Sequence, residues 1–448
     1  MGIPRVLTIA GSDSGGGAGI QADLKTFASL GVQGMSAVTS ITAQNTMEVS
    51  KILDLPIGII KAQITAVADD IGFDAIKIGM LYKKNIVESI GSLISKFKVP
   101  IVVDPVMVSK GGSRLLDTDA YDAMVTSMIP RATVLTPNIR EAEVISNIKI
   151  RSIKNVKEAA KVISKLGPEA VVIKGGHLQH NGTAIDTLFW RNRFNFFEAK
   201  RIDTEDTHGT GCTFSSAIAA NLAKGRDVLD AVRDAKEFVS NAIIHAYRVG
   251  GGHGPVNPSG AINRSASSYE ILLDLQEGIE IIESGPRVHL LSPECQMNIG
   301  VAIPGAMSKD DVMAVPGRIV NLGSNVKASS SPRFGASKHV ANTILAAMNV
   351  NSSRRAAINI RYSDIIIKEC KKMRWSVFDY DRSEEPLNVK MTEGGSTSWG
   401  AKKAIDNAGV VPDVIYHLGE IGKEPMVLIL GNTAKEVASK AVSLSERL

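Results

Sequence analysis

The sequence predicts an α/β fold: a mostly parallel sheet with helices on both faces, followed by a second, smaller α/β domain. Short continuous apolar runs alternate with segments whose apolar residues recur at helical spacing. Continuous apolar runs are typical of strands buried on both faces, as in parallel sheets. The 448 residues suffice for two or three domains, and residues 253–268, rich in Gly, Pro, Asn and Ser, are expected to be a linker. We therefore expect domains at residues 1–262 and 263–448.

The composition is typical of a globular protein, with 44% hydrophobic and 22% charged residues. The net charge of +5 is a small excess, and no cluster of Lys and Arg with interleaved aromatic residues indicates nucleic-acid binding. No apolar run reaches the length of a membrane span. Three cysteines without metal-site spacing favour a reducing compartment. We expect a cytoplasmic homodimer that binds small molecules, without nucleic-acid or membrane partners.

The first half alternates strands and helices from its beginning. Residues 6–10 form an apolar strand that runs into a glycine-rich loop at residues 11–19, and a helix is expected at residues 20–30. The same two patterns repeat along the chain, as they do where helices connect parallel strands. Further strands are expected at residues 36–42, 75–78, 100–103, 132–135, 170–173 and 192–202. Further helices are expected at residues 56–69, 86–97, 118–128, 154–166 and 213–223, and another is expected to open at Glu141.

The glycine-rich loop is a candidate ligand contact because it joins a strand to a helix. It lacks the lysine of a P-loop and the spacing of a dinucleotide fingerprint, so neither of those functions is predicted. Asp23 lies on the first turn of the following helix. Its carboxylate could bind a hydroxyl or amine of a ligand, or it could complement the helix dipole.

Polar residues follow several expected strands at the point where each strand ends. Gln44 could read a donor/acceptor edge of a heterocycle, or it could form a turn. Asp104 and Glu141 are carboxylates suited to Mg²⁺, with Asn138 in support, although each also fits a cap or surface position. Lys174 could neutralise the oxygens of a transferring phosphate. Because ligands bind outside the carboxyl ends of strands in open α/β sheets, these side chains are expected to share a site.

A second glycine turn, at residues 206–212, precedes the helix expected at residues 213–223. Gly209 and Gly211 flank Thr210, so that the backbone can turn tightly and present bare N–H groups. The helix directs the positive end of its dipole to the same place. Cys212 follows, where a thiol can be activated or can donate a hydrogen bond. A plain loop is the alternative, but with Lys174 this turn predicts a phosphoryl-transfer site without a P-loop.

Taken together, these motifs resemble the hydroxymethylpyrimidine/phosphomethylpyrimidine kinases of the ribokinase-like superfamily, over residues 3–256. The matching stretches are residues 10–26 (AGSDSGGGAGIQADLKT), 43–46 (AQNT), 77–81 (KIGML), 104–107 (DPVM), 136–142 (TPNIREA), 174–178 (KGGHL), 207–213 (THGTGCT) and 253–256 (HGPV).

This resemblance implies ATP- and Mg²⁺-dependent phosphorylation of 4-amino-5-hydroxymethyl-2-methylpyrimidine and then of its monophosphate. It implies that the pyrimidine contacts Gly11, Asp23, Gln44, Met80 and Val106. It implies that Lys174, Asn138, Glu141, Gly209, Thr210 and Gly211 lie on the side of ATP and Mg²⁺. We also expect Thr207 to bind the nucleotide and Asp104, with Glu141, to bind the metal.

Cys212 stands where many sugar kinases of this superfamily carry an aspartate base. A thiolate must therefore form, or the thiol only orients and donates; we favour a direct catalytic role. The alternative for the first half is a pyridoxal-type kinase, against which Gln44 and the KIGML stretch favour the pyrimidine.

The second half is also expected to be α/β, of uncertain strand order. A short strand is expected before Leu291, and a Gly/Ser/Thr loop at residues 393–400 is expected to be followed by a helix. Further strands are expected at residues 300–303, 319–321, 357–360, 376–380, 414–416 and 426–430, and helices at residues 269–283, 365–373 and 433–444, with another running to residue 348.

Cationic residues of this half fall at the ends of expected elements and fit a phosphate or pyrophosphate ligand, although a scatter of surface charges is the alternative. His339 could be a proton-transfer group or an ordinary helix residue. The cations are Arg318, Arg333, Arg361, Arg382 and Lys423.

This half resembles the archaeal-type thiamine-phosphate synthase domain over residues 270–445. The matching stretches are residues 333–339 (RFGASKH), 361–364 (RYSD), 393–400 (EGGSTSWG) and 422–426 (GKEPM).

The resemblance implies coupling of the pyrimidine diphosphate to a thiazole phosphate, with release of pyrophosphate. It implies that Arg318 and His339 are catalytic, and we expect Arg333 and Lys423 to bind substrate. Related domains serve as ligand sensors, so a non-catalytic sensing domain is the alternative, although no helix-turn-helix is attached here.

Overall fold

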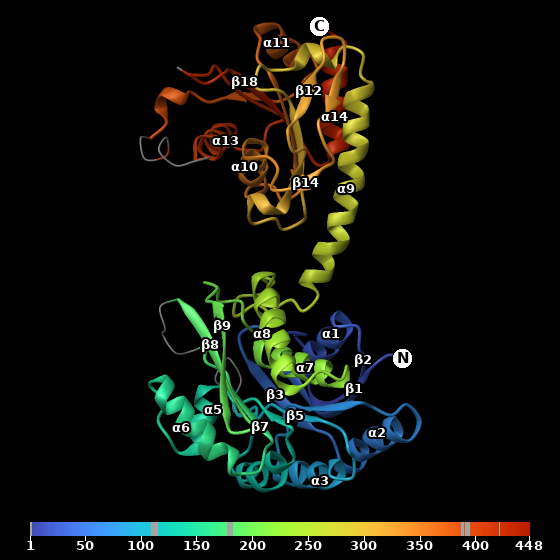
Figure 1. The fold of residues 1–448 in the computed structure, drawn as a ribbon, viewed down its shortest axis with the longest axis vertical. Coiled ribbons are helices and arrows are strands. Elements are labelled where there is room, and N and C mark those ends of the chain that lie inside the picture. The colour runs from blue at the N-terminus through green and yellow to red at the C-terminus, as the bar shows by residue number, and fades with distance from the viewer. Residues whose placement is uncertain (1, 109–114, 177–181, 387–388, 390–394, 421) are drawn as a thin grey trace. The chain divides into compact units, whose positions relative to one another are not determined.

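The computed structural model describes residues 2–108, 115–176, 182–386, 389, 395–420 and 422–448 (Figure 1). The chain separates into two compact units, Met1–Ile262 and Asn263–Leu448. Each unit has its own sheet and its own apolar clusters.

The first unit is built on a nine-stranded sheet in the order β3-β2-β1-β4-β5-β6-β7-β8-β9. The six neighbouring strands β2, β1, β4, β5, β6 and β7 run parallel, as the apolar runs predicted. Antiparallel pairing adds β3 at one edge of the sheet and β8 and β9 at the other. The strands are β1 Arg5–Asp13, β2 Gln33–Gln44, β3 Val49–Asp54, β4 Ala75–Ile78, β5 Ile101–Val103, β6 Val134–Leu135, β7 Ala170–Ile173, β8 Thr183–Trp190 and β9 Arg193–Lys200.

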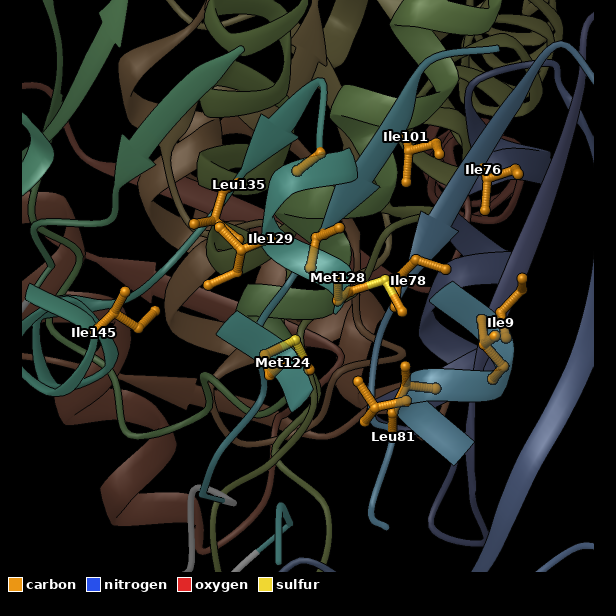
Figure 2. Packing of buried hydrophobic residues seen from close by; sticks show 14 of the residues in the cluster. Ile9, Ile76, Ile78, Leu81, Ile101, Met124, Met128, Ile129, Leu135 and Ile145 are labelled. Atoms are coloured by element: carbon orange, nitrogen blue, oxygen red, sulfur yellow. The ribbon is translucent and has the colours of Figure 1, made fainter. Parts of the chain in front are cut away.

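Helices cover both faces of this sheet because successive strand residues point to opposite faces. Ile76 and Ile78 pack with the helices α2, α3, α5 and α6 in one cluster, part of which Figure 2 shows. Ala75 packs with α1, α7 and α8 on the other face. The helices are α1 Gly19–Ser29, α2 Ile57–Asp70, α3 Lys84–Ile94, α4 Ala120–Ala123, α5 Ile139–Ser146, α6 Ile153–Ser164, α7 Thr210–Ala223 and α8 Val228–Ile244.

Three elements of this unit were not expected from the sequence: β3, β8 and α8. Gln44 was expected in a polar tip, but it ends β2 and pairs with Val49 of β3. The helix expected at residues 118–128 is shorter and irregular. It comprises α4, a π-helical turn Met124–Met128 and a 3₁₀ turn Ile129–Arg131.

The second unit has a mixed, mostly antiparallel sheet of seven described strands, in the order β14-β11-β10-β15-β18-β17-β16. Among these described strands, only β16 and β17 pair in parallel. A hairpin of β12 and β13 stands apart from it. The strands are β10 Asn298–Ala302, β11 Val312–Ala314, β12 Ile319–Asn321, β13 Val326–Ala328, β14 Arg333–Phe334, β15 Ala356–Arg361, β16 Val377–Asp379, β17 Val414–His417 and β18 Met426–Gly431.

Helices again cover both faces. Residues of α9, α11 and α14 pack in one apolar cluster, and residues of α10 and α13 pack in another. The carboxylate of Asp274 on α9 accepts hydrogen bonds from the backbone N–H groups of Ala434 and Lys435, at the start of α14. The helices are α9 Gly260–Ser284, α10 Lys338–Met348, α11 Asp364–Lys372, α13 Gly395–Ala408 and α14 Ala434–Ser445, with 3₁₀ turns Val288–Leu291, Lys309–Asp311 and Arg382–Glu384.

Three expectations for the junction and the second unit were wrong. Residues 260–268 were expected in a linker but form the first turns of α9, because Gly and Ser do not break a helix whose later turns are packed. The short strand expected before Leu291 is a 3₁₀ turn. Residues 395–400 of the expected loop belong to α13; residues 393 and 394 lie outside the described part.

No helix in the described part of the chain is both long enough and apolar enough to cross a bilayer.

Candidate functional site

The carboxyl ends of the parallel strands bring most of the sequence-predicted residues of the first unit to one edge of the sheet. Asp104 follows β5, Asn138 follows β6 and Lys174 follows β7. Backbone pairing of Asn138 with Lys174 extends the sheet by one residue at this edge. The shared edge therefore explains why residues far apart in the sequence lie together.

The ion pair between Lys174 Nζ and Asp104 Oδ1, 2.8 Å long, is the centre of this site. A Cβ atom added at Gly211 would lie 3.4 Å from Lys174 Nζ and 3.4 Å from Asp104 Oδ2, so the first turn of α7 faces the pair. Burial alone would lower the pKa of Lys174, but Asp104 and Glu141 outweigh it and raise that pKa. Lys174 therefore stays positively charged beside the helix N-terminus.

The turn before α7 is shaped by its two glycines. Gly209 has a left-handed φ of 79°, and a Cβ atom there would lie 1.8 Å from the carbonyl oxygen of Gly17. This close approach packs the turn against the glycine-rich loop. The Thr210 hydroxyl donates a hydrogen bond of 2.7 Å to the Thr207 carbonyl oxygen, which fixes the entry to the helix.

Asn138 and Glu141 form a capping box at the start of α5. The Glu141 backbone N–H donates to Asn138 Oδ1, and the Asn138 backbone N–H donates to Glu141 Oε2. Burial raises the pKa of Glu141 to about 7; Lys174 opposes this rise, and Asp104 adds to it. The structure thus gives these two residues a helix-capping contact in addition to their place beside Lys174.

Cys212 lies on the first turn of α7. Burial raises the pKa of its thiol to about 11, although the Lys77 ammonium opposes the shift. A thiol with such a pKa is neutral at pH 7. A resting thiolate, one of the two alternatives for Cys212, is therefore not favoured by this environment.

The structure places the Asp23 carboxylate among donors of the protein itself, and its expected contact with the substrate stays a prediction. Its side chain is fully buried, and its carboxylate accepts hydrogen bonds from the Thr8 and Ser216 hydroxyls, each 2.7 Å long, and from Lys77 Nζ at 2.9 Å. A carboxylate tolerates burial only when it is paired and hydrogen-bonded, and these three donors meet that requirement. Through these bonds Asp23 links α1 to β1, α7 and β4.

The other residues expected to hold the pyrimidine lie at or beyond the ends of β1, β2, β4 and β5 and in the glycine-rich loop. Gly11 and Met80 are neighbours, since a Cβ atom at Gly11 would lie 3.2 Å from the Met80 sulfur. The Val106 backbone N–H donates a hydrogen bond of 2.8 Å to the Asp104 carbonyl oxygen. Gln44 ends β2 beside the glycine-rich loop, where its backbone carbonyl oxygen accepts a hydrogen bond from the Ser14 hydroxyl.

Two residues that sequence reasoning did not single out, Asp13 and His208, connect the two glycine loops. The Asp13 carboxylate accepts hydrogen bonds from the backbone N–H groups of Gly15, Gly17 and Ala18, and it lies 3.0 Å from His208 Nε2. The sequence contained a signal for Asp13, which precedes the glycine run of the first loop. An aspartate in that position commonly accepts hydrogen bonds from the N–H groups that follow it.

A separate cluster of cations and histidines lies in the second unit. His339 opens α10, and its Nδ1 lies 2.9 Å from Thr397 Oγ1 near the start of α13. Burial lowers the pKa of His339, and so do the nearby Arg318, Arg382 and Lys423. The contact of His339 with Thr397 thus brings the first turns of α10 and α13 together, and the charges of Arg318, Arg382 and Lys423 reach His339, although Arg382 is also paired with Glu385. This arrangement suits an anion such as phosphate.

His417, which sequence reasoning missed, belongs to the same cluster. It is buried at the end of β17, and its Nδ1 accepts a hydrogen bond from the backbone N–H of Gly419. Burial, together with Arg382, His339 and Lys423, lowers its pKa to about 4. Both histidines are therefore neutral at neutral pH.

The remaining predicted residues of this unit are more exposed. Lys423 Nζ lies 3.4 Å from the Ser396 hydroxyl. Arg318 has a left-handed φ of 73° and donates a hydrogen bond to the Cys295 carbonyl oxygen. Arg333 is exposed on the edge strand β14, so its part in the cluster is not evident from its position.

Comparison with known families gives two matches along the chain. Residues 13–257 match the phosphomethylpyrimidine kinase family, and residues 274–443 match the thiamine-phosphate synthase ThiN family.

Comparison with individual proteins agrees for the first unit. The hydroxymethylpyrimidine/phosphomethylpyrimidine kinase of Streptomyces coelicolor is 46% identical over 259 residues, which are 58% of this chain and 96% of that protein. The thiamine biosynthesis bifunctional protein ThiED of Geobacter sulfurreducens is 46% identical over 253 residues, which are 56% of this chain and 51% of that protein.

Among solved structures, the pyridoxal kinase of Staphylococcus aureus in complex with AMP-PCP and pyridoxal is 37% identical. It covers 59% of this chain and 96% of its own, with a TM-score of 0.55. The resemblance stated from the motifs is thus confirmed: the chain belongs to the phosphomethylpyrimidine kinase family, and its second half is a thiamine-phosphate synthase domain of the ThiN family.

Proposed function

We propose that residues 1–262 are a kinase domain that phosphorylates 4-amino-5-hydroxymethyl-2-methylpyrimidine and then its monophosphate with ATP, and that residues 263–448 join the resulting diphosphate to a thiazole phosphate. The chain is thus a bifunctional enzyme of thiamine biosynthesis. The observation that carries the kinase assignment is the convergence of Lys174, Asp104 and Gly211 at the N-terminus of α7.

In this proposal Lys174 and the backbone N–H groups of residues 209–211 bind the phosphoryl group as it moves. Negative charge spreads over its oxygens in the transition state, and preorganised donors stabilise that charge without having to reorient. The neutral thiol of Cys212 lies next in the chain and acts as a hydrogen-bond donor or orienting group at the acceptor alcohol. Asp104 accepts from Lys174 and holds its ammonium in place.

Mg²⁺ belongs to this proposal through Asp104 and Glu141. Both carboxylates are buried close to the Lys174 ammonium, and the raised pKa of Glu141 records their mutual repulsion as well as its burial. A divalent cation held through water suits such a pair. Mg²⁺ bound there would neutralise charge on the nucleotide phosphates.

The kinase proposal is tested by incubating the purified full chain with ATP, Mg²⁺ and the pyrimidine alcohol. Mass spectrometry is expected to detect first the monophosphate and then the diphosphate. ATP hydrolysis without either product would contradict the proposal.

Pyridoxal is a second candidate acceptor, favoured by the 37% identity to a pyridoxal kinase solved with that ligand. A competition of the two acceptors for limiting ATP separates the candidates. We expect the pyrimidine to be consumed first; preferential consumption of pyridoxal would reverse the assignment.

For the second domain we propose that Arg318, His339 and Lys423 bind the departing pyrophosphate, and that Arg333 binds substrate at the rim. The amino group of the pyrimidine can stabilise the benzylic cation that forms as the C–O bond to pyrophosphate breaks, and the thiazole nitrogen then attacks this carbon. Pyrophosphate carries the electron pair away, so cations that stabilise it favour the step. The left-handed φ of Arg318, a non-glycine residue, supports a functional role.

Arg318→Ala and His339→Ala test this assignment in the full chain. With pyrimidine diphosphate and thiazole phosphate supplied, each variant is expected to form thiamine phosphate at least about 100-fold more slowly, since each loses a charge or donor at the reacting group. Kinase activity in the same samples is the control. A wild-type chain that binds thiamine phosphate but never forms it would establish the sensing alternative instead.

We also propose that the chain forms a homodimer. Ile41 on β2 and its register partner Leu53 on the edge strand β3 are both exposed apolar residues, and they offer a surface for a second copy. Light scattering after size-exclusion chromatography measures the mass; a monomer at all concentrations would contradict this proposal.

A further inference from the structure

The side-chain amide of Gln44 lies between two polar groups whose own hydrogen bonds are already determined. Gln44 Oε1 lies 3.2 Å from Thr42 Oγ1, and Gln44 Nε2 lies 3.2 Å from His208 Nε2. Thr42 Oγ1 also lies 2.9 Å from the Ser12 carbonyl oxygen, and His208 Nε2 lies 3.0 Å from Asp13 Oδ2. Each of the two neighbours thus has a second partner.

Those second partners can only accept. A hydroxyl has one proton, and Thr42 must give it to the Ser12 carbonyl oxygen, so Thr42 can only accept from Gln44. Asp13 accepts three backbone N–H groups, and His208 must therefore donate its Nε2–H toward that carboxylate. A nitrogen that carries this proton cannot also accept from Gln44.

Both neighbours therefore favour the same orientation of the Gln44 amide, which exchanges the positions of Oε1 and Nε2 given above: the NH₂ group then faces Thr42 and the side-chain oxygen faces His208. The two ends of an amide have the same shape, so the protons of the neighbours decide between them. The Nε2–H of His208 is then shared between Asp13 and Gln44 as a three-centre bond. The proton of the Thr42 hydroxyl and the proton on His208 Nε2 thus lead independently to the same orientation of the amide.

This arrangement leaves one edge of the amide available. Each primary amide has two N–H groups and two lone pairs on its oxygen. One N–H of Gln44 donates to Thr42 Oγ1, and one lone pair of its side-chain oxygen accepts from His208 Nε2–H. The remaining N–H and lone pair lie side by side on the outer edge, in an order that the flanking partners determine.

We propose that His208 and Thr42 are positioning residues that lock the Gln44 amide, and that this lock makes the site select a heterocycle with an amino donor beside a ring-nitrogen acceptor. A 4-oxo analogue of the pyrimidine presents an acceptor beside an N–H donor, which is the reverse order. The locked amide rejects it, whereas a free amide could rotate and accept it. This inference rests on the proposed kinase function.

The test compares kcat/KM for the 4-amino pyrimidine alcohol and its 4-oxo analogue, using the full chain. Thr42→Val and His208→Phe each remove one flanking partner with little change of shape. Each variant is expected to lower the ratio of kcat/KM for the amino compound to kcat/KM for the oxo compound by about 10- to 100-fold. The reason is that a site rejects the wrong analogue through the polar groups that the analogue leaves unpaired. The two variants act on opposite ends, so one remains informative if the other does not fold.

Conservative variants distinguish this lock from a merely structural role. Thr42→Ser keeps the hydroxyl and His208→Gln keeps an N–H near the position of Nε2, so both are expected to recover most of the selectivity. Equal losses for both substrates, with the ratio unchanged in Thr42→Val and His208→Phe, would overturn the inference.

Calorimetric binding of the two compounds separates this inference from the kinase proposal, because it does not depend on turnover. A wild-type chain that prefers the amino compound but transfers no phosphate would refute the proposed function and leave the lock in place. Equal affinity of the wild-type chain for both compounds would refute the lock.

Discussion

At the scale of single residues, the kinase domain buries charge in pairs. Lys77 and Asp23 are both fully buried, and 2.9 Å separates their charged atoms. Burial lowers the pKa of Lys77, but Asp23 and its neighbours outweigh it and raise the pKa to about 12. Removing one partner from such a pair leaves an uncompensated charge in the interior, which is far less favourable than the intact pair.

Asp23→Asn is therefore expected to lower the free energy of unfolding by about 3–5 kcal/mol, the usual effect of breaking a buried pair. Urea denaturation of the full chain measures the change. Asp74→Asn is the matched control, because Asp74 pairs with Arg5 at the surface and should contribute about 1 kcal/mol or less. Equal effects of the two variants would contradict the buried-pair argument.

Glu141 gives a prediction about pH. Its pKa is about 7 when folded, so between about pH 4.5 and about pH 7 the folded chain binds more protons than the unfolded chain. The contribution of Glu141 to stability is therefore present at low pH and lost as the pH rises through about 7.

Glu141→Gln removes this dependence. Its free energy of unfolding relative to wild type is expected to increase from about pH 5 to about pH 7 and then to level off. Denaturation series at several pH values, without nucleotide, measure this difference. A difference that stays constant with pH would show that Glu141 is already ionised in the folded chain.

At the scale of elements, the turn before α7 contains two glycines with different tasks. Gly209 is required by the backbone, since its φ is positive and its neighbour Gly17 is too close for a side chain. Gly211 is not left-handed and has room for a methyl group in ordinary contact, but that methyl group would face Lys174 and Asp104.

Gly209→Ala is expected to lower stability, because strain at a position with positive φ adds to a steric clash. Gly211→Ala is expected to fold normally and to lose kinase kcat by about 10- to 100-fold, as it fills the space of the transferring phosphoryl group. Thermal unfolding and steady-state kinetics on both variants separate the two effects. A stable, fully active Gly211→Ala variant would contradict the anion-site assignment.

The sequence predicted most elements of the first unit because its parallel strands are continuous apolar runs. It did not predict β3, whose exposed residues lack such a run. It predicted a helix after residue 400 but missed the first turns of α13, which consist largely of Gly, Ser and Thr. The hydrogen-bond partners of Asp23 could also not be predicted from the sequence. The sequence placed Asp23 on the first turn of its helix, but α1 begins at Gly19, so Asp23 lies in the second turn. A carboxylate near the start of a helix looks the same whether it faces a ligand or a buried lysine, and only the register of β4 beside β1 brings Lys77 to it.

At the scale of the whole molecule, each domain has its own apolar clusters. Those of the first domain lie between Val6 and Val239, and those of the second between Ile271 and Leu444. The sites follow the same division, with Lys174 in one domain and His339 in the other. A change at one site should therefore leave the other reaction intact, and the product of the first reaction is the substrate of the second.

The most direct measurement of the central claim uses Lys174→Gln in the full chain. Given ATP, Mg²⁺ and the pyrimidine alcohol, this variant is expected to form the mono- and diphosphate at least about 100-fold more slowly than wild type, because it lacks the cation at the phosphoryl group. Given the pyrimidine diphosphate and thiazole phosphate, it is expected to form thiamine phosphate at the wild-type rate. Wild-type kinase rates in Lys174→Gln would contradict the account.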